Sequence, residues 1–276
     1  MTTFAILLSM LSADTPAMNE LQLLKVFRSE FVAITPGQGK FPAQFQMGDP
    51  AEPKQTQTIR FADPVEVGKA SVALPPPFEM AKYEVTQELW EAVMNANPSR
   101  WKGPRNSVEM ITRNDADEFC RRVTTKLRAA KLIAADQIVA LPSEAQWEYC
   151  ARAGTTTKYS FGDDATQIDD YAWHTGNAAG NDPPVGAKKP NAWGFYDIHG
   201  YLWEICADDW LEDVSKLPDD GRPYRRVPPS NPPEHVVRGG SWKDKAEAST
   251  SGSRRKLSSP EADDAVGLRC VLMTSP

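Results

Sequence analysis

The chain has 276 residues, of which 41% are hydrophobic and 25% are charged, and its formal net charge is −6. This length suits one large domain with a substantial core, and no apolar stretch is long enough to cross a bilayer. The acidic balance argues against a general nucleic-acid-binding protein, because such proteins need a dense basic surface.

Two apolar segments open the chain. Residues 4–13, FAILLSMLSA, are apolar enough for the core of a secretory signal, although no lysine or arginine precedes them. A short helix is expected next, because apolar residues recur at helical spacing at Leu21, Leu24, Phe27 and Phe31. We expect residues 1–31 to be either a signal remnant, with export to the periplasm or the cell exterior, or a helical segment packed on a cytoplasmic protein.

Several elements are expected further along the chain. Residues 32–47 alternate loosely around two glycines, which predicts a hairpin. Helices are predicted at 86–94, with Thr86 as the cap, and at 115–127. A third helix should begin after Ser143, because Ser143 and Gln146 have the spacing of a capping box. From residue 155 onward the pattern indicates mostly loops and short strands.

Five sequence blocks occur in a fixed order: FQMGDP at 45–50, FEMAKYEVTQELWEAV at 78–93, LPSEAQWEYCARAG at 141–154, PNAWGFYDIHGYLWEI at 190–205, and VVRGGSW at 236–242 followed by GLRC at 267–270. Together they resemble the formylglycine-generating enzyme family, also called the sulfatase-modifying-factor family. For residues 32–276 the resemblance implies an irregular α+β domain related to the C-type lectin fold, with few regular strands, many loops and three to four helices.

The resemblance also implies a calcium site in the fourth block. Its ligands would be the side chains of Asp197 and Glu204 and the carbonyl groups of Gly200 and Leu202. Calcium takes six to eight oxygen ligands, which two carboxylates and a turn of carbonyls help to supply. The structural alternative is an Asx turn at Asp197, with Glu204 accepting hydrogen bonds from backbone amides.

Two residues of this block depart from the family pattern. Tyr201 stands where relatives usually carry asparagine, and Ile205 stands where they carry an aromatic residue. Neither position is an expected calcium ligand, so the site is compatible with both changes. Trp203 is expected to pack in the core.

The residues after Ser241 argue against the best-known chemistry of the family. In formylglycine-generating enzymes, cysteines three and eight residues after this serine bind copper(I) and oxidise a substrate cysteine. Those positions hold Asp244 and Ser249 here. Copper(I) prefers soft thiolates to a carboxylate and a hydroxyl, so we expect neither copper nor this oxidation.

No other catalytic set is evident from residue spacing. The three histidines, His174, His199 and His235, do not combine with carboxylates in a pattern that indicates an iron site. Asp244 lies between Lys243 and Lys245, which is typical of a solvated charge cluster.

Two functions therefore compete. The first is a calcium-stabilised accessory protein that binds a peptide or protein ligand in a groove formed by Arg238, Gly239, Gly240, Ser241, Trp242, Asp244 and Ser249. The second is a divergent oxidase of a peptide or small substrate, with Asp244 in a metal-binding or acid-base role. Loss of both cysteines favours binding. A structural alternative also exists, in which the paired glycines let two segments cross and Trp242 lies in the core.

Four cysteines, Cys120, Cys150, Cys206 and Cys270, allow two disulfides or four buried thiols. The resemblance implies a pair between Cys150 and Cys270. However, Ala151 occupies the position of the family cysteine, and one step along a helix turns a side chain by about 100°.

Overall fold

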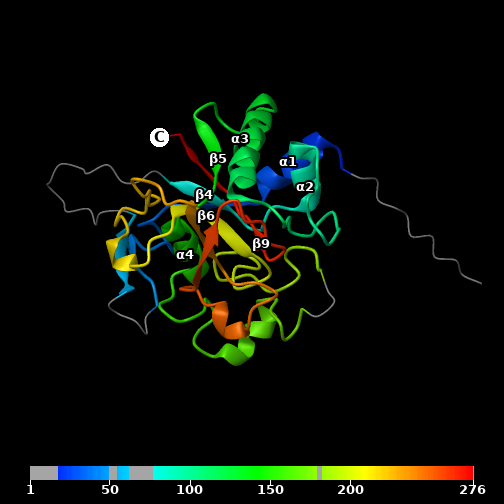
Figure 1. The fold of residues 1–276 in the computed structure, drawn as a ribbon. Helices are drawn as coiled ribbons and strands as arrows, with labels where there is room; N and C mark the ends of the chain where they lie inside the picture. Colours follow the sequence, from blue (N-terminus) through cyan, green and yellow to red (C-terminus); the bar gives the residue numbers. More distant parts are fainter. Residues whose placement is uncertain (1–17, 50–54, 62–76, 179–181, 276) are drawn as a thin grey trace, which may run out of the picture.

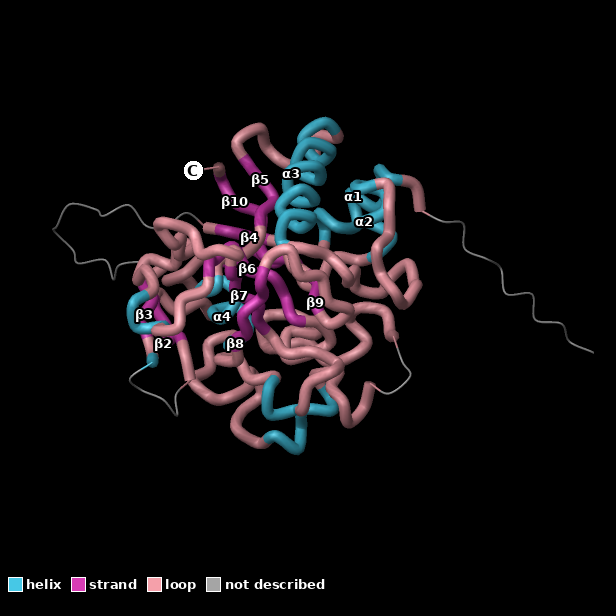
Figure 2. The backbone as a smooth tube through the Cα atoms, in the orientation of Figure 1, coloured by secondary structure: helices cyan, strands magenta, loops and turns pink. Residues whose placement is uncertain are grey.

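The computed structural model describes residues 18–49, 55–61, 77–178 and 182–275. In these ranges the chain forms an α+β fold with two four-stranded sheets, a separate two-stranded sheet and four α-helices. Loops make up much of the molecule (Figure 2). The predicted α+β class and helix number are confirmed, and no strand in the described ranges exceeds seven residues.

The α-helices are α1 (Glu20–Ser29), α2 (Gln87–Met94), α3 (Arg113–Ala129) and α4 (Glu144–Arg152). Short 3-10 turns are η2 (Ala165–Asp170), η3 (Val214–Lys216) and η4 (Ala246–Ala248). The strands are β1 (Phe31–Ile34), β2 (Gln44–Met47), β3 (Gln57–Arg60), β4 (Phe78–Ala81), β5 (Gln137–Ala140), β6 (Trp203–Asp209), β7 (Glu234–Arg238), β8 (Arg254–Ser258), β9 (Val266–Gly267) and β10 (Val271–Thr274).

The first sheet joins the two ends of the described chain. Its order is β1-β4-β10-β5, and every pair is antiparallel. Helices α1, α2 and α3 lie together beside it (Figure 1). They share one apolar core with the sheet, in which the rings of Trp90 and Phe119 stack with their centroids 5.1 Å apart.

The second sheet positions the candidate sites. Its order is β8-β7-β6-β9, and β6 runs antiparallel to β7 but parallel to β9. Because β6 and β7 are antiparallel, the first residues of β6 lie beside the last residues of β7, and Glu204 pairs in register with Arg238. The turn before β6 and the glycine pair after β7 therefore meet at the same end of this sheet.

One of the two predicted helix caps makes its side-chain hydrogen bonds. The Gln146 amide donates to the Ser143 hydroxyl and the Ser143 amide donates to the Gln146 side chain, which confirms the predicted capping box. Thr86 is the N-cap of α2, but its side chain makes no capping hydrogen bond. The helix predicted at 115–127 is two residues longer at each end, and Thr112 and Asp115 form a capping box at its start.

The predicted hairpin at 32–47 is wrong. Strand β1 pairs with β4, whereas β2 pairs with β3, so the two strands of this segment have different partners. Alternation of apolar and polar residues indicates which side chains of a strand face the core. It does not predict which other strand pairs with it.

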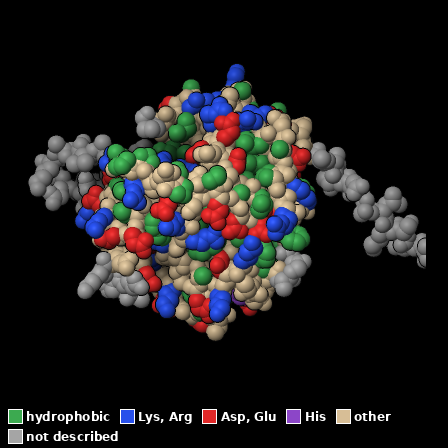
Figure 3. Space-filling view, viewed as in Figure 1, with side chains coloured by type: hydrophobic (Ala, Val, Ile, Leu, Met, Phe, Trp, Pro, Cys, Tyr) green, Lys and Arg blue, Asp and Glu red, His purple; other side chains and the backbone are tan. Residues whose placement is uncertain are grey.

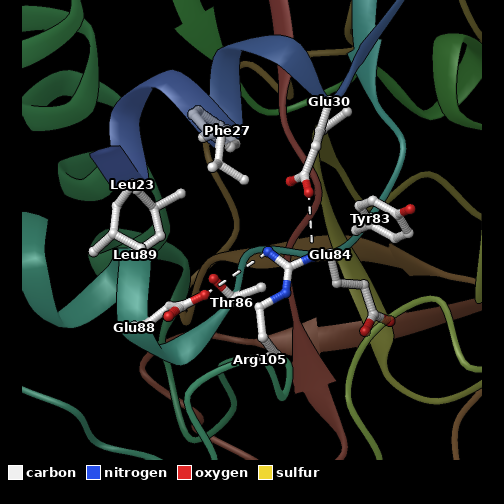
Figure 4. A pocket seen from close by; sticks show the side chains of 11 residues that line it. Leu23, Phe27, Glu30, Tyr83, Glu84, Thr86, Glu88, Leu89 and Arg105 are labelled. Carbon is white, nitrogen blue, oxygen red and sulfur yellow. Dashed lines mark hydrogen bonds and ion pairs between the residues drawn. The ribbon is translucent and has the colours of Figure 1, made fainter. Parts of the chain in front are cut away.

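Helix α1 is held against the rest of the fold by apolar contacts and by one arginine. Leu23 and Phe27 are buried with Leu89 of α2 in one core. Beside them, the Arg105 guanidinium lies between Glu30, at 3.2 Å, and Glu88, at 3.8 Å (Figure 4). The predicted N-terminal helix is present, although Leu21 is exposed and Phe31 belongs to β1. The apolar segment 4–13 lies outside the described residues.

All four cysteines are buried thiols. Cys270 makes a hydrogen-bonding contact with Cys120 and shares a core with it, whereas Cys150 lies in a different core cluster. The pairing of Cys150 with Cys270 is therefore not observed. Within the described ranges, every helix is too short or too polar to cross a bilayer, which agrees with the expectation from composition.

Candidate functional site

Asp244 occupies a defined position at the end of the second sheet. The Ser241 hydroxyl donates a hydrogen bond to Asp244 Oδ2, and Trp203 Nε1 donates a second one to the same oxygen at 2.7 Å. Within the described residues no hydrogen bond reaches the other oxygen, Oδ1. The side chain is half-buried, so one carboxylate oxygen is fixed by two donors while the other accepts no hydrogen bond from the described residues.

Ser249 does not share this setting. It is fully buried, and its hydroxyl has no hydrogen-bond partner among the described residues. It packs against Gly240, where a Cβ would collide with the Ser249 hydroxyl and lie 3.0 Å from its Cα. Gly240 has φ 82°, a left-handed conformation that favours glycine. The glycine at 240 therefore makes room for Ser249 within the fold.

Arg238 faces inward as well. Its guanidinium forms an ion pair with Glu148, lies 3.5 Å from Glu144, and donates to the carbonyl groups of Ser251 at 3.0 Å and Gly252 at 2.9 Å. Arg238 and both glutamates are fully buried. This arrangement gives Arg238 a structural role, in which it links β7 to α4 and to the loop that contains Ser251 and Gly252.

Trp242 lies between the partly exposed Asp244 and the buried Arg238 along the chain. Its backbone amide donates to the Tyr201 carbonyl at 2.9 Å, and its Nε1 donates to the Asp264 carbonyl at 3.2 Å. The indole is half-buried, with the Lys243 ammonium 5.3 Å from the ring centroid. Of the seven predicted groove residues, only Trp242 and Asp244 are partly exposed. The other five, Arg238, Gly239, Gly240, Ser241 and Ser249, are buried.

Glu204 lies in a saturated buried network. Arg269 donates to both of its oxygens, with Nη2 to Oε1 at 2.7 Å and Nε to Oε2 at 2.9 Å. Trp147 Nε1 donates to Oε2 at 2.7 Å. Both Glu204 and Arg269 are fully buried, so their mutual attraction offsets the cost of removing each charge from water.

Two more carboxylates share this interior. Burial raises the pKa of Asp197 to about 6, against the opposing effects of the Gly186 amide and Arg269. Burial also raises the pKa of Glu84 well above its ordinary value, and the charges of Glu204 and Asp197 add to the shift. Of the carboxylates of Glu84, Asp197 and Glu204, only that of Glu204 forms an ion pair with a guanidinium among the described residues. The cluster therefore has more acidic than basic groups.

The predicted calcium ligands fit a cation only in part. Asp197 Oδ2 accepts from the Gly186 amide at 2.6 Å, while Oδ1 is buried and has no hydrogen-bond partner among the described residues. A cation would satisfy that oxygen. Glu204 is different, because a cation there would have to displace Arg269 or Trp147. In the described ranges, no three His, Cys, Asp or Glu side chains are arranged to hold a metal by themselves.

The three histidines lie in separate settings. His174 Nε2 lies 2.7 Å from Asp169, and His235 Nδ1 lies 3.3 Å from Asp209. His199 is buried: its Nε2 accepts from the Ser160 amide at 3.1 Å, so Nδ1 carries the proton and donates to the Ser249 carbonyl at 3.0 Å. Burial lowers the pKa of His199 to about 4. This histidine therefore links the 199 turn to Ser249 as a neutral ring.

Sequence reasoning missed part of this arrangement. Glu84 and Arg269 lie in the blocks YEVTQ and GLRC, whose spacing indicates the family but does not show that the two side chains meet in the interior. Trp203 was expected only to pack in the core, yet it also donates to Asp244. A buried tryptophan needs a partner for its ring N–H, and that requirement was the available signal.

The family is shown by comparison with known proteins. The sequence profile of the Sulfatase-modifying factor enzyme 1-like domain matches residues 28–274, and the chain belongs to this family. It is 29% identical over 172 residues to Chaperone protein LppX of Paenibacillus barcinonensis, covering 47% of this chain and 61% of LppX. It is 32% identical over 173 residues to the formylglycine-generating enzyme of Thermomonospora curvata, covering 55% of this chain and 50% of the enzyme. The matches thus span about half the length of these relatives.

Solved structures share the fold across most of the chain. Treponema denticola variable protein 1 superimposes with a TM-score of 0.70 at 25% identity, covering 89% of this chain and 95% of that protein. PvdO from Pseudomonas aeruginosa superimposes with a TM-score of 0.69 at 24% identity, covering 88% and 93%. The predicted family and fold are confirmed.

Replacing Arg269 should test the buried network. Arg269→Met leaves Glu204 buried without its partner, and we expect a loss of about 3–5 kcal/mol in the free energy of unfolding. The matched control is Arg255→Met, because Arg255 is part-exposed and pairs with Asp263, and it should cost no more than about 1 kcal/mol. Urea denaturation of both variants gives the comparison, and equal unfolding midpoints would contradict the role of Arg269.

Acid should weaken the fold through His199. Its native pKa of about 4 lies below the ordinary value of 6.5, so the unfolded chain binds a proton first as the pH falls through this window. Stability tied to this ring is therefore complete above pH 6.5 and declines toward pH 4, by about 3 kcal/mol in total. Urea denaturation at several pH values, with NMR titration of the ring, measures the effect. An unchanged acid dependence in His199→Asn would contradict it.

Proposed function

We propose that this protein is a member of the sulfatase-modifying-factor family that binds a peptide or protein ligand without oxidising it. The ligand contacts the surface at Trp242 and Asp244, and the buried Ser241 holds Asp244 in place. The observation that carries the proposal is the Asp244 carboxylate, which is held through Oδ2 by Ser241 and Trp203. A preorganised acceptor binds a ligand with little further loss of side-chain entropy.

The chemical character of the site supports binding over copper oxidation. A carboxylate and a buried hydroxyl stand at the two positions where the family enzymes carry copper-binding thiols. Each cysteine of this chain is buried in a core cluster, so none offers a thiolate beside Asp244. Copper(I) has no suitable soft ligand there.

The alternative of a divergent oxidase has no observation in its favour. The three histidines occupy separate settings, and each has its own partners. A relative that bears the name of a chaperone supports a protein-binding role, since such a role requires contact and no chemistry on the partner. The proposal does not extend to the full activities of these relatives, because the matched region is about half of each of them.

We also propose that calcium stabilises the turn between Asp197 and Glu204. The unpartnered Asp197 Oδ1 and the excess of buried acid support this, and the carbonyl groups of Gly200 and Leu202 would complete the set implied by the family. A bound cation supplies positive charge to this interior. Direct coordination by Glu204 would require the cation to displace Arg269 or Trp147 from its oxygens.

Asp244→Asn should weaken ligand capture without unfolding the protein. The change removes the negative charge while keeping the shape, and losing one charge-assisted hydrogen bond corresponds to about tenfold weaker binding. Quantitative mass spectrometry of partners captured from the source cells compares wild type, Asp244→Asn and Ser241→Ala. The matched control is Asp220→Asn, an exposed aspartate paired with Arg222.

Two outcomes would contradict the proposal. One is wild-type capture of every partner by folded Asp244→Asn and Ser241→Ala proteins. The other is conversion of a cysteine-containing sulfatase peptide to its aldehyde by the unmodified protein with added copper.

Calcium should raise the melting temperature of the wild type more than that of Asp197→Asn. A ligand that binds only the native state stabilises it by about 2.7 kcal/mol at a hundredfold excess over its dissociation constant. The effect should be smaller at pH 5 than at pH 7.5, because Asp197 binds a proton below about pH 6. Asp213→Asn, at an exposed position, is the control. Identical melting curves in calcium and in chelator would rule the site out.

A further inference from the structure

A basic groove lies between helix α3 and strands β5 and β6, away from the Asp244 surface. Its volume is about 380 Å³. Four arginines line it, together with one acidic residue: Arg113, Arg121, Arg128, Arg225 and Asp117. Figure 3 shows lysine and arginine side chains gathered at the α3 end of the molecule. This concentration of positive charge contrasts with the net charge of −6 of the whole chain.

Within the described residues, two of the four arginines are held by neutral acceptors. Arg113, which is buried, pairs with Asp117 at 2.9 Å, and Arg121 pairs with Glu118, so the charges of these two are offset. Arg128 donates to the Gln137 carbonyl at 3.1 Å, and Arg225 donates to the Ala207 carbonyl and has its carboxylate, Asp209, only at 4.0 Å. Carbonyl groups orient a guanidinium without cancelling its charge. Arg128 and Arg225 therefore give the groove positive charge with oriented donors.

The floor of the groove is apolar. Ile138, Val139, Leu141 and Ala207 line it below the arginines. Strand β5 is an outer strand, but its free edge is covered, because the Val139 amide donates to Thr124 Oγ1 at 2.9 Å and Arg128 Nε donates to the Gln137 carbonyl at 3.1 Å. A ligand must then bind through its side chains and not as an added strand.

The length of the groove points to an extended ligand. Its lining follows α3 from the buried Arg113 to the exposed Arg128, which lie 15 positions apart and correspond to about 22 Å at 1.5 Å per residue. An extended peptide covers that distance with about seven residues, at roughly 3.3 Å each. A single small anion would contact only one end.

We propose that this groove is a second binding site, which takes an acidic peptide segment of a partner protein with apolar residues among its carboxylates. The carboxylates pair with the guanidinium groups of Arg128 and Arg225, and the apolar side chains pack on the floor. The site is independent of Asp244, which lies on the loop after β7.

Fluorescence anisotropy with a labelled heptapeptide that alternates glutamate and leucine tests the proposal at low salt. We expect Arg128→Gln and Arg225→Gln each to bind about tenfold more weakly, since each loses a charge-assisted contact. Both side chains are exposed, so these variants should keep the wild-type melting temperature. Arg60→Gln, which removes an exposed charge from β3, and Asp244→Asn should bind as wild type.

Further measurements decide between the outcomes. Weaker binding at high salt, and no binding of the matching lysine–leucine peptide, would support the proposal. Equal affinity in all variants, or no binding of the glutamate peptide by the wild type, would overturn it. Displacement of the peptide by millimolar phosphate would also overturn it and assign the groove to a small anion.

Discussion

The buried ion pair of Arg269 and Glu204 is the constraint on which both candidate sites depend. Besides Glu204, the Arg269 guanidinium donates to the carbonyl groups of Ala81 at 3.1 Å, Lys82, and Tyr196 at 2.8 Å. One side chain thereby joins the end of β4, the turn before β6 and the start of β6. Because the pair is fully buried, it is favourable only while all of these contacts are present. The positions of Trp203 and of the turn at Asp197 follow from it.

A second buried network supports the neighbouring strand, and the residues proposed to contact a ligand lie outside both networks. Arg238 joins β7 to α4 through Glu148, whereas Asp244 lies on the loop that follows. Changes in that loop leave the buried ion pairs intact. A fold of this kind can lose one chemistry and keep its shape, because function resides in the site and not in the fold.

Local sequence signals predicted the helices well, since capping residues such as Ser143 act within one turn. The order of the motif blocks identified the family, and counting from Ser241 placed Asp244. The pairing of β1 with β4 could not be predicted, because strands distant in sequence compete for the same edge. The burial of Ser249 behind Gly240 and the bond from Trp203 to Asp244 were equally inaccessible, since both arise from contacts between distant segments.

The contact between Thr124 and strand β5 protects the protein against self-association. An outer strand with free backbone groups is a template for pairing with other molecules, and here helix α3 supplies the cover. Unfolding of α3 would expose this edge of the strand, so the stability of α3 contributes to the resistance of the protein to self-association.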